Sequence, residues 1–255
     1  MSVTSGDIKV YGCANMQDTD VGTVGGAINT GLLMIFDNAT LANAPGGNGQ
    51  LSYTSTWAGD TTNISITGRN TGGSIVGQTN AMSGLSIASG TQIWERILKI
   101  DVPNHSGIIT VKDQAGSTIT TIPSGVTQVR RPFYNVSSDI AGGSTKQYYE
   151  KVFLRNNNIT LNLLEVNVYE LTGGLASSVS WALDLVQNGT TTATNRRTAP
   201  AAGIGAWVTD QTISGIPGGD LNAGSGLGVW LNLTLTAGAA ATKDIYTLAV
   251  SGSTI

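Results

Sequence analysis

Residues 63–79 read NISITGRNTGGSIVGQT, and this stretch decides the fold class. Ile64 and Ile66 alternate with polar residues, which is the period of a half-buried β-strand. The glycine-rich turn at residues 70–73 leads into a second apolar run, so the stretch predicts a β-hairpin. Residues 108–122, IITVKDQAGSTITTI, repeat the arrangement around a turn at 114–116 and predict a second hairpin.

Further short apolar runs between glycine-rich turns predict strands along the rest of the chain. In the strongest of them, residues 91–102, alternation places Trp94, Leu98 and Ile100 on one face. The segment Lys146–Arg155 comes nearer to a helical pattern than any other part of the chain, but its residues fit a strand better. The other predicted strands are 31–36, 51–57, 159–171, 178–187, 228–238 and 244–250. Strands of this spacing are typical of sandwiches and barrels.

We therefore expect an all-β protein with two β-sandwich-like domains, either immunoglobulin-like or jelly-roll-like, and an extended N-terminal arm. Residues 1–30 are polar and glycine-rich, which favours an arm or an edge strand, and residues 31–128 form the first domain. The strand pattern pauses over residues 129–145, where we place a junction. Residues 146–255 form the second domain.

The composition argues against catalysis. Only 11% of the 255 residues are charged, against about 25% in typical soluble proteins. One histidine (His105) and one cysteine (Cys13) rule out an internal disulfide and a four-ligand zinc site. Thirteen Lys and Arg with a net charge of −3 disfavour nucleic-acid binding. We also expect no secretory signal and no membrane helix, because no long apolar run is present.

Individual polar residues give no catalytic pattern. His105 lies between two predicted strands and is expected in a surface loop, and Asp184 falls on the outer face of its strand. The close carboxylate pairs Glu165/Glu170 and Asp210/Asp220 are not in a pattern that predicts a cleft. We expect no enzyme, no cofactor and no metal.

The polar arm contains one weak candidate for a metal-binding site. Asp18 and Asp20 lack the spacing of a calcium loop, so a solvated arm is favoured over a cation site.

Aromatic and basic residues supply candidate contacts instead. Trp94 and Trp181 are expected in the core, whereas Trp230 and Trp207 are candidates for exposure, Trp207 in a glycine-rich loop. Two arginine pairs are candidates for contact with acids on a partner subunit. The full set of candidate contact residues is Asp7, Lys9, Tyr11, Asp18, Asp20, Arg130, Arg131, Phe133, Tyr134, Arg196, Arg197 and Trp207.

Three segments resemble structural proteins of tailed-bacteriophage virions. They are TSGDIKVYGCANM (4–16), VTQVRRPFYNVSSDIAGGSTKQYYEKVFLRN (126–156) and GVWLNLTLTAGAAATKDIYTLAVSG (228–252). The resemblance implies a β-rich particle component made in the cytoplasm of a bacterial host. It implies no catalytic residue.

The leading expectation is a capsid decoration (cement) protein that binds across neighbouring major capsid protein subunits. Repetition on a symmetric lattice multiplies weak contacts, which suits such a protein. Partners are then the capsid protein and copies of the chain itself, a trimer by analogy, with no nucleic acid and no membrane. Two alternatives stay open: a neck, tail or baseplate component, and a module that binds sugar on a host surface.

Overall fold

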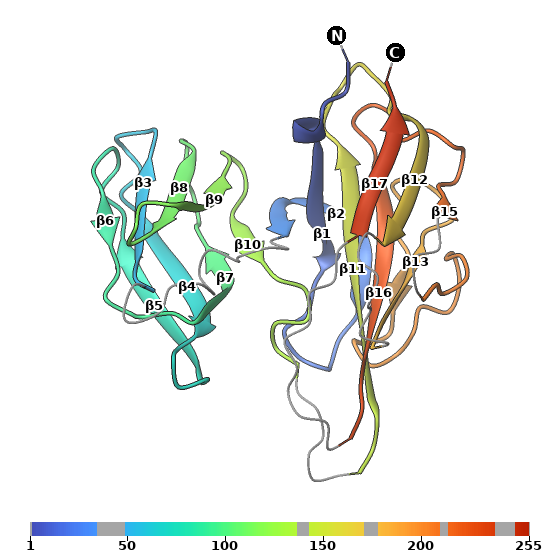
Figure 1. Ribbon diagram of the computed structural model, residues 1–255, viewed down its shortest axis with the longest axis horizontal. Coiled ribbons are helices and arrows are strands. Elements are labelled where there is room, and N and C mark those ends of the chain that lie inside the picture. The colour runs from blue at the N-terminus through green and yellow to red at the C-terminus, as the bar shows by residue number, and fades with distance from the viewer. Residues whose placement is uncertain are drawn as a thin grey trace. The chain divides into compact units, whose positions relative to one another are not determined.

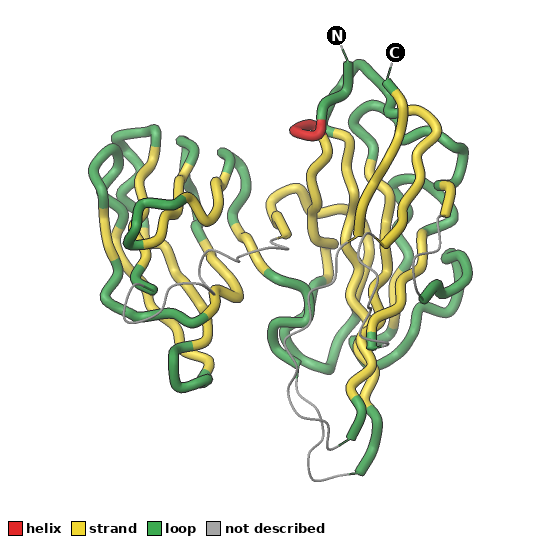
Figure 2. Tube along the Cα trace, viewed as in Figure 1, coloured by secondary structure: helices red, strands yellow, loops and turns green. Residues whose placement is uncertain are grey.

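The structure, a computed structural model, describes residues 2–34, 49–136, 143–170, 178–209, 214–237 and 248–254. Strands and loops make up this part of the chain, apart from one 3-10 turn, η1, at Ser5–Asp7 (Figure 2). The expectation of an all-β, sandwich-like fold is confirmed. Figure 1 labels the strands, which keep those labels below.

The chain divides into two compact units. Unit 1 comprises residues 1–29 and 135–255, and unit 2 comprises residues 30–134. The chain thus passes from unit 1 into unit 2 within strand β2 (Val24–Met34) and returns between Tyr134 and Asn135. The return lies inside the predicted junction, of which residues 137–142 lie outside the described residues.

Unit 2 is a two-sheet sandwich. One sheet has the order β6-β3-β8-β9. The other joins the last residues of β2 to β10, β7, β4 and β5 in that order. The bounds of the strands are β3 Leu51–Ser55, β4 Asn63–Arg69, β5 Ile75–Ala81, β6 Ala88–Ser89, β7 Arg96–Asp101, β8 Ile109–Asp113, β9 Thr118–Ile122 and β10 Gln128–Arg130.

Alternating apolar side chains from both sheets fill the core of unit 2. Tyr53 and Val111 come from one sheet, and Ile64, Ile66 and Ile100 from the other. Burying such residues is the main stabilising contribution, at about 1.5–3 kcal/mol each. Both predicted hairpins, β4–β5 and β8–β9, are confirmed as antiparallel pairs.

Strand β7 departs from the predicted alternation. The register of its pairing with β4 shifts at Thr67/Gly68, so one residue of β7 is inserted between the partners Ile97 and Lys99. Such a bulge reverses which side chains face inward. Ile97 therefore joins the core with Ile100, and the expectation that Leu98 shares the face of Trp94 and Ile100 is wrong.

Unit 1 contains a larger sheet with the order β13-β16-β11-β1-β2, and β14 pairs with the start of β2. A second sheet has the order β15-β12-β17. The bounds of these strands are β1 Ile8–Asn15, β11 Lys146–Asn156, β12 Leu164–Glu170, β13 Val179–Leu183, β14 Thr192–Ala193, β15 Ser214–Gly215, β16 Gly226–Leu235 and β17 Leu248–Ser253.

Strand β11 is the long central strand of unit 1. It pairs with β16 along ten residues and with β1 along five. Residues 148–154 are buried on both faces of the strand, as in strands covered on both sides. This confirms the reading of Lys146–Arg155 as a strand.

The expectation that residues 1–30 form an extended arm or an edge strand needs correction, because β1 lies between β11 and β2 in the sheet. Ile8–Asn15 forms β1, whose register on β11 runs from Ile8 opposite Asn156 to Gly12 opposite Val152. Tyr11 and Cys13 are buried there. The N-terminal segment is polar overall, but its few apolar residues are buried where β1 lies between β11 and β2. The segment is therefore an integral strand of the sheet.

Candidate functional site

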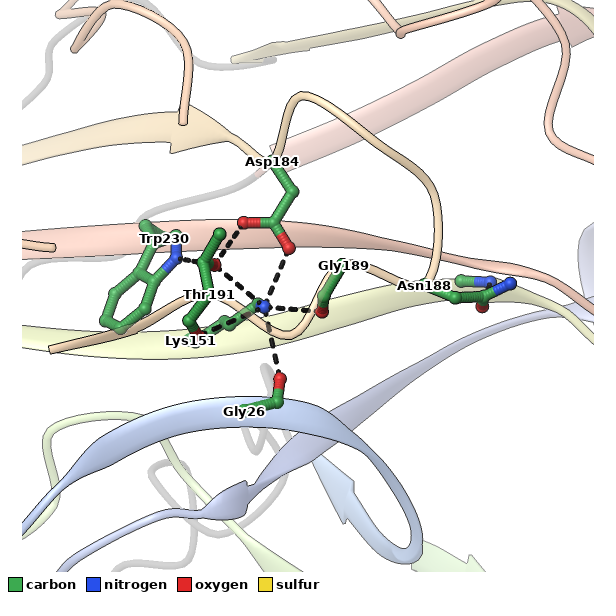
Figure 3. A network of polar contacts seen from close by, with 8 residues as sticks. Gly26, Lys151, Asp184, Asn188, Gly189, Thr191 and Trp230 are labelled. Atoms are coloured by element: carbon green, nitrogen blue, oxygen red, sulfur yellow. Dashed lines mark hydrogen bonds and ion pairs between the residues drawn. The ribbon is translucent and has the colours of Figure 1, made fainter. Parts of the chain in front are cut away.

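A buried polar centre lies inside unit 1, next to β11 and β16 (Figure 3). Lys151 comes from β11 and Trp230 from β16, while Asp184 and Thr191 come from the segment that follows β13. The side chains of Lys151 and Asp184 are both 0% exposed. A buried lysine and aspartate require partners, because an unpaired charge in an apolar interior is strongly unfavourable.

The Lys151 ammonium is surrounded by oxygen atoms. Its Nζ lies 2.7 Å from Oδ2 of Asp184. It donates to the carbonyl oxygens of Gly26, at 3.1 Å, and Gly189, at 2.8 Å. It also lies 3.0 Å from Oγ1 of Thr191. These four oxygens outnumber the three donors of an ammonium group, so each N–H has an acceptor within reach.

Thr191 connects the lysine to the rest of the centre. Its hydroxyl donates to Oδ1 of Asp184 at 2.5 Å and accepts a hydrogen bond from Nε1 of Trp230 at 2.8 Å. The Phe153 ring centroid lies 4.6 Å from the Lys151 nitrogen, so aromatic surface closes the space around the polar atoms.

Two glycines make room for this centre. A Cβ at Gly228 of β16 would lie 2.7 Å from Cε of Lys151 and 2.7 Å from Cγ of Asp184. A Cβ at Gly25 would lie 2.8 Å from the Trp230 ring, and its φ of +97° is one that glycine adopts readily. The local sequence therefore leaves gaps that the ion pair and the indole fill.

Burial shifts the protonation equilibrium of Lys151. Loss of hydration lowers the pKa of Lys151, and the hydrogen bond and negative charge of Asp184 oppose that shift without cancelling it. The ammonium is thus easier to deprotonate here than in water.

A second buried ion pair lies elsewhere in unit 1. Arg196 pairs with Glu150 of β11, with side-chain exposures of 0% and 1%. Its guanidinium also lies 5.6 Å from the Tyr148 ring centroid, and that of Arg197 lies 4.3 Å from the same ring. Arg196 further donates to the carbonyl oxygen of Asn135. These contacts place both arginines in the structure of unit 1.

Unit 2 exposes four large apolar side chains on neighbouring loops, and we term this set the apolar tip. Its members Trp57, Leu85, Ile87 and Ile108 are 57%, 64%, 73% and 47% exposed. The loops that carry them are joined by backbone hydrogen bonds, from Thr56 to Ile108 and from Ser55 to Gly84. The tip therefore belongs to a pre-ordered set of loops.

Asp60 holds two of these loops together. It is 3% exposed and accepts hydrogen bonds from the backbone N–H groups of Ser106 and Gly107, both at 2.9 Å. The Ser55 hydroxyl donates to it at 2.5 Å. A Cβ at Gly107 would lie 2.8 Å from that of Trp57, so the backbone at residue 107 fits closely under the tryptophan.

The expectation of His105 in a surface loop is wrong, because the imidazole is buried beneath the same loops. Nδ1 lies 2.8 Å from the carbonyl oxygen of Gly107, and Nε2 lies 2.6 Å from that of Val126. Both ring nitrogens are thus engaged in fixing the loops, which supports a structural role.

Tryptophans follow the sequence expectations only in part. Trp94 and Trp181 are buried, as expected. Trp230 is completely buried, which corrects its expected exposure. Trp207 is half-buried and its ring centroid lies 5.6 Å from that of Tyr149, so it packs against the core. The most exposed tryptophan is Trp57, at the apolar tip.

The N-terminal candidate contact residues are spread along η1, β1 and the turn after it. Lys9 and Asp20 are exposed, and Asp18 is half-buried. Asp7 accepts hydrogen bonds from the backbone and hydroxyl of Thr4 within η1, which lower its carboxyl pKa. Tyr11 is buried and accepts a hydrogen bond from an asparagine side chain.

The junction candidates belong to unit 2. Arg130 is 1% exposed and its guanidinium lies 4.8 Å from the Tyr134 ring centroid. Arg131 donates from Nε to the carbonyl oxygen of Ile97, and Phe133 is half-buried with a φ of +53°. The structure thus uses these residues to build the end of unit 2.

The predicted exposure of Asp184 is wrong. Alternation put it on an outer face, whereas it is completely buried against Lys151. Neither residue was singled out as part of a site. The available signal was a lysine inside the apolar stretch 148–154 and an aspartate inside 181–186, two charges in runs of apolar residues.

Within the described ranges, no three His, Cys, Asp or Glu side chains gather as a metal site would require. Asp210 of the carboxylate pair with Asp220 lies outside the described residues. In the described part of the chain no helix has the length and apolar character to cross a membrane. The chain matches no family model, no curated protein and no solved structure.

Proposed function

We propose that the chain is a non-enzymatic structural protein of a phage virion, a capsid decoration protein that binds across neighbouring capsid subunits. The observation that carries the binding role is the apolar tip. Four large apolar side chains are exposed on loops that a buried network holds in place. Such an exposed cluster marks an interaction surface.

The chemistry of the buried groups supports a structural role over an enzymatic one. His105 and Asp60 bind backbone groups, and the lysine and arginine of the two buried pairs are matched to carboxylates. These titratable groups are engaged inside the fold, away from a substrate. The placement on a virion rests on the sequence resemblance alone.

The test of the binding role is a matched pair of variants on purified shells that lack this protein. Trp57→Ser should weaken binding by about tenfold or more, because tryptophans dominate interface energetics. Ile159→Ser is the control, since Ile159 is 82% exposed and belongs to unit 1. Equal binding by the Trp57 variant and the parent protein would exclude the tip as the contact surface.

Copy number per particle separates the decoration role from its closest alternative. Quantitative mass spectrometry against the major capsid protein should give a count equal to the shell protein or a simple fraction of it. A count of a few or about a dozen copies per particle would assign the protein to the neck, tail or baseplate, because rings of that size are closed assemblies of few subunits. Absence from particles would refute the virion proposal.

Sugar binding is the second candidate, and Trp57 favours it, because an exposed indole offers a flat apolar face for stacking. Trp207, packed on Tyr149, is the weaker candidate. Retention on a glycan array that Trp57→Ala abolishes would support this function and count against the shell contact.

A further inference from the structure

We propose that the Lys151 amine and the Asp184 carboxyl condense within the folded chain to form an amide bond. This isopeptide bond would join β11 covalently to the segment that follows β13. The inference concerns the buried centre of unit 1 and is independent of the proposed function.

Proximity is the first argument. Lys151 Nζ lies 2.7 Å from Asp184 Oδ2, and the carboxyl carbon is one bond further. Carbonyl oxygens of Gly26 and Gly189 hold the nitrogen in place (Figure 3). Groups held in such positions react with effective concentrations on the order of 10⁵–10⁸ M, far above those of free partners.

Desolvation is the second argument. Both side chains are 0% exposed, so the pair has no bulk water to stabilise its charges. Burial favours the neutral amine of Lys151, which is the nucleophilic form. The lowered pKa of Lys151 agrees with this. Condensation then removes two buried charges and releases a water molecule from a dry site.

Thr191 provides a path for the proton. Its hydroxyl lies 3.0 Å from Lys151 Nζ and donates to Asp184 Oδ1 at 2.5 Å. The Trp230 indole N–H donates to the Thr191 hydroxyl oxygen and so fixes the orientation of this hydroxyl. A hydroxyl between the two reacting groups can accept a proton from one and donate a proton to the other.

The atoms of the reaction balance without an oxidant or a co-reactant. One ammonium proton passes to the carboxylate, which leaves a neutral amine and a carboxylic acid. Nζ then attacks Cγ and a C–N bond forms, while a second nitrogen proton passes through the Thr191 hydroxyl to the departing oxygen. The C–O bond breaks, that oxygen leaves as water with both protons, and the nitrogen keeps one proton as an amide N–H.

The position of the bond explains why Gly228 lies beneath it. Strands β11 and β13 both pair with β16, one on each side. The Lys151 and Asp184 side chains meet over Gly228, where a Cβ would contact both. The amide would therefore span β16 and link β11 to the segment that follows β13 on the other side of it.

Intact-mass spectrometry of the denatured full-length protein tests whether the isopeptide bond forms. The expected mass is lower than that of the sequence by one water molecule, with a branched peptide linking the fragments that contain Lys151 and Asp184. A full sequence mass, with both fragments recovered as separate linear peptides, would overturn the proposal and leave an ordinary ion pair.

Three comparisons make the assignment specific. Lys151→Arg keeps the positive charge and should restore the full mass, whereas water lost by cyclisation of an aspartate elsewhere would persist. Asp184→Asn should give the same product by releasing ammonia. The Lys99–Asp101 pair of unit 2, with its nitrogen and oxygen 3.1 Å apart, is partly exposed and should yield only linear peptides.

A Thr191→Val variant tests the proton path. Valine keeps the shape of threonine but lacks the hydroxyl, so a larger fraction of freshly folded protein should retain the full sequence mass at early times. Conversion at the parent rate would show that the hydroxyl takes no part in the transfer, while the mass of the parent protein still decides whether the bond forms.

Discussion

At the scale of single residues, Asp60 organises the loops beneath the apolar tip. Burial alone would raise the pKa of its carboxyl, but the hydrogen bonds from Ser55, Ser106 and Gly107 outweigh that effect and lower the pKa below its usual 3.8. A carboxyl whose pKa is lower in the folded state stabilises the fold above pH 3.8. That stabilisation is lost as the pH falls below 3.8 towards the lowered value.

Replacing this carboxylate should destabilise unit 2 at neutral pH. We expect Asp60→Asn to reduce the free energy of unfolding by about 2 kcal/mol, because buried N–H donors lose a charged acceptor. The difference in the free energy of unfolding between the variant and the parent protein should become smaller below pH 3.8. Denaturant unfolding at pH 7 and pH 3 would measure this difference. Asp20→Asn, at an exposed site, should leave stability unchanged; an equal loss there would contradict the argument.

At the scale of elements, β16 depends on Gly228 as much as on its apolar residues. Trp230 and Leu231 are buried in β16, and Gly228 gives the Lys151–Asp184 pair its space. Periodicity predicted β16 as a strand, yet nothing local indicates that one of its positions must lack a side chain. That requirement comes from two residues on the strands or segments to either side.

A methyl group at this position should disrupt the centre. Gly228→Ala is expected to lower the free energy of unfolding by about 3 kcal/mol or more, through overpacking and loss of the buried pair. Thermal and denaturant melts would measure the loss. The control is Gly205→Ala, whose Cβ would meet only the carbonyl oxygen of Leu183, at 3.7 Å. Equal melts for both variants would refute the role given to Gly228.

Strand β7 shows the limit of pattern reasoning at this scale. Alternation predicts the two faces of β7 correctly only where each residue of β7 pairs with one residue of β4. The bulge opposite Thr67 and Gly68 inserts an extra residue, and Ile97 rather than Leu98 joins the core cluster of Ile100, although both side chains are buried. A bulge depends on the partner strand, so the sequence of β7 alone does not reveal it.

At the scale of the whole molecule, the N-terminal segment belongs to unit 1 together with the C-terminal half of the chain. Unit 2 is a single continuous stretch inserted into it. If residues 1–30 were an extended arm outside the sheets, a chain that lacks residues 1–25 would still fold. Strand β1 and its pairing with β11 predict the opposite.

Truncation should therefore separate the two units. A chain lacking residues 1–25 loses β1 and buried Tyr11, Cys13 and Val24, and unit 1 should fail to fold. The fragment 30–134 retains all residues of unit 2 and should unfold cooperatively on its own. Circular dichroism and thermal melts of both products would test this. A cooperatively folded unit 1 without β1 would show that the segment is an accessory after all.

The sequence by itself determined the all-β class, the two hairpins, and most strands, because alternation and turn residues act over a few neighbouring positions. It also excluded a disulfide and indicated that Trp94 and Trp181 are buried. Only the tertiary structure decided that Asp184, His105, Arg196 and Trp230 lie inside and that the segment 8–15 is a central strand. Their burial depends on partners far along the chain, such as Lys151 for Asp184 and Val126 for His105. A local pattern distinguishes two faces of a strand, but packing alone decides which of them is covered.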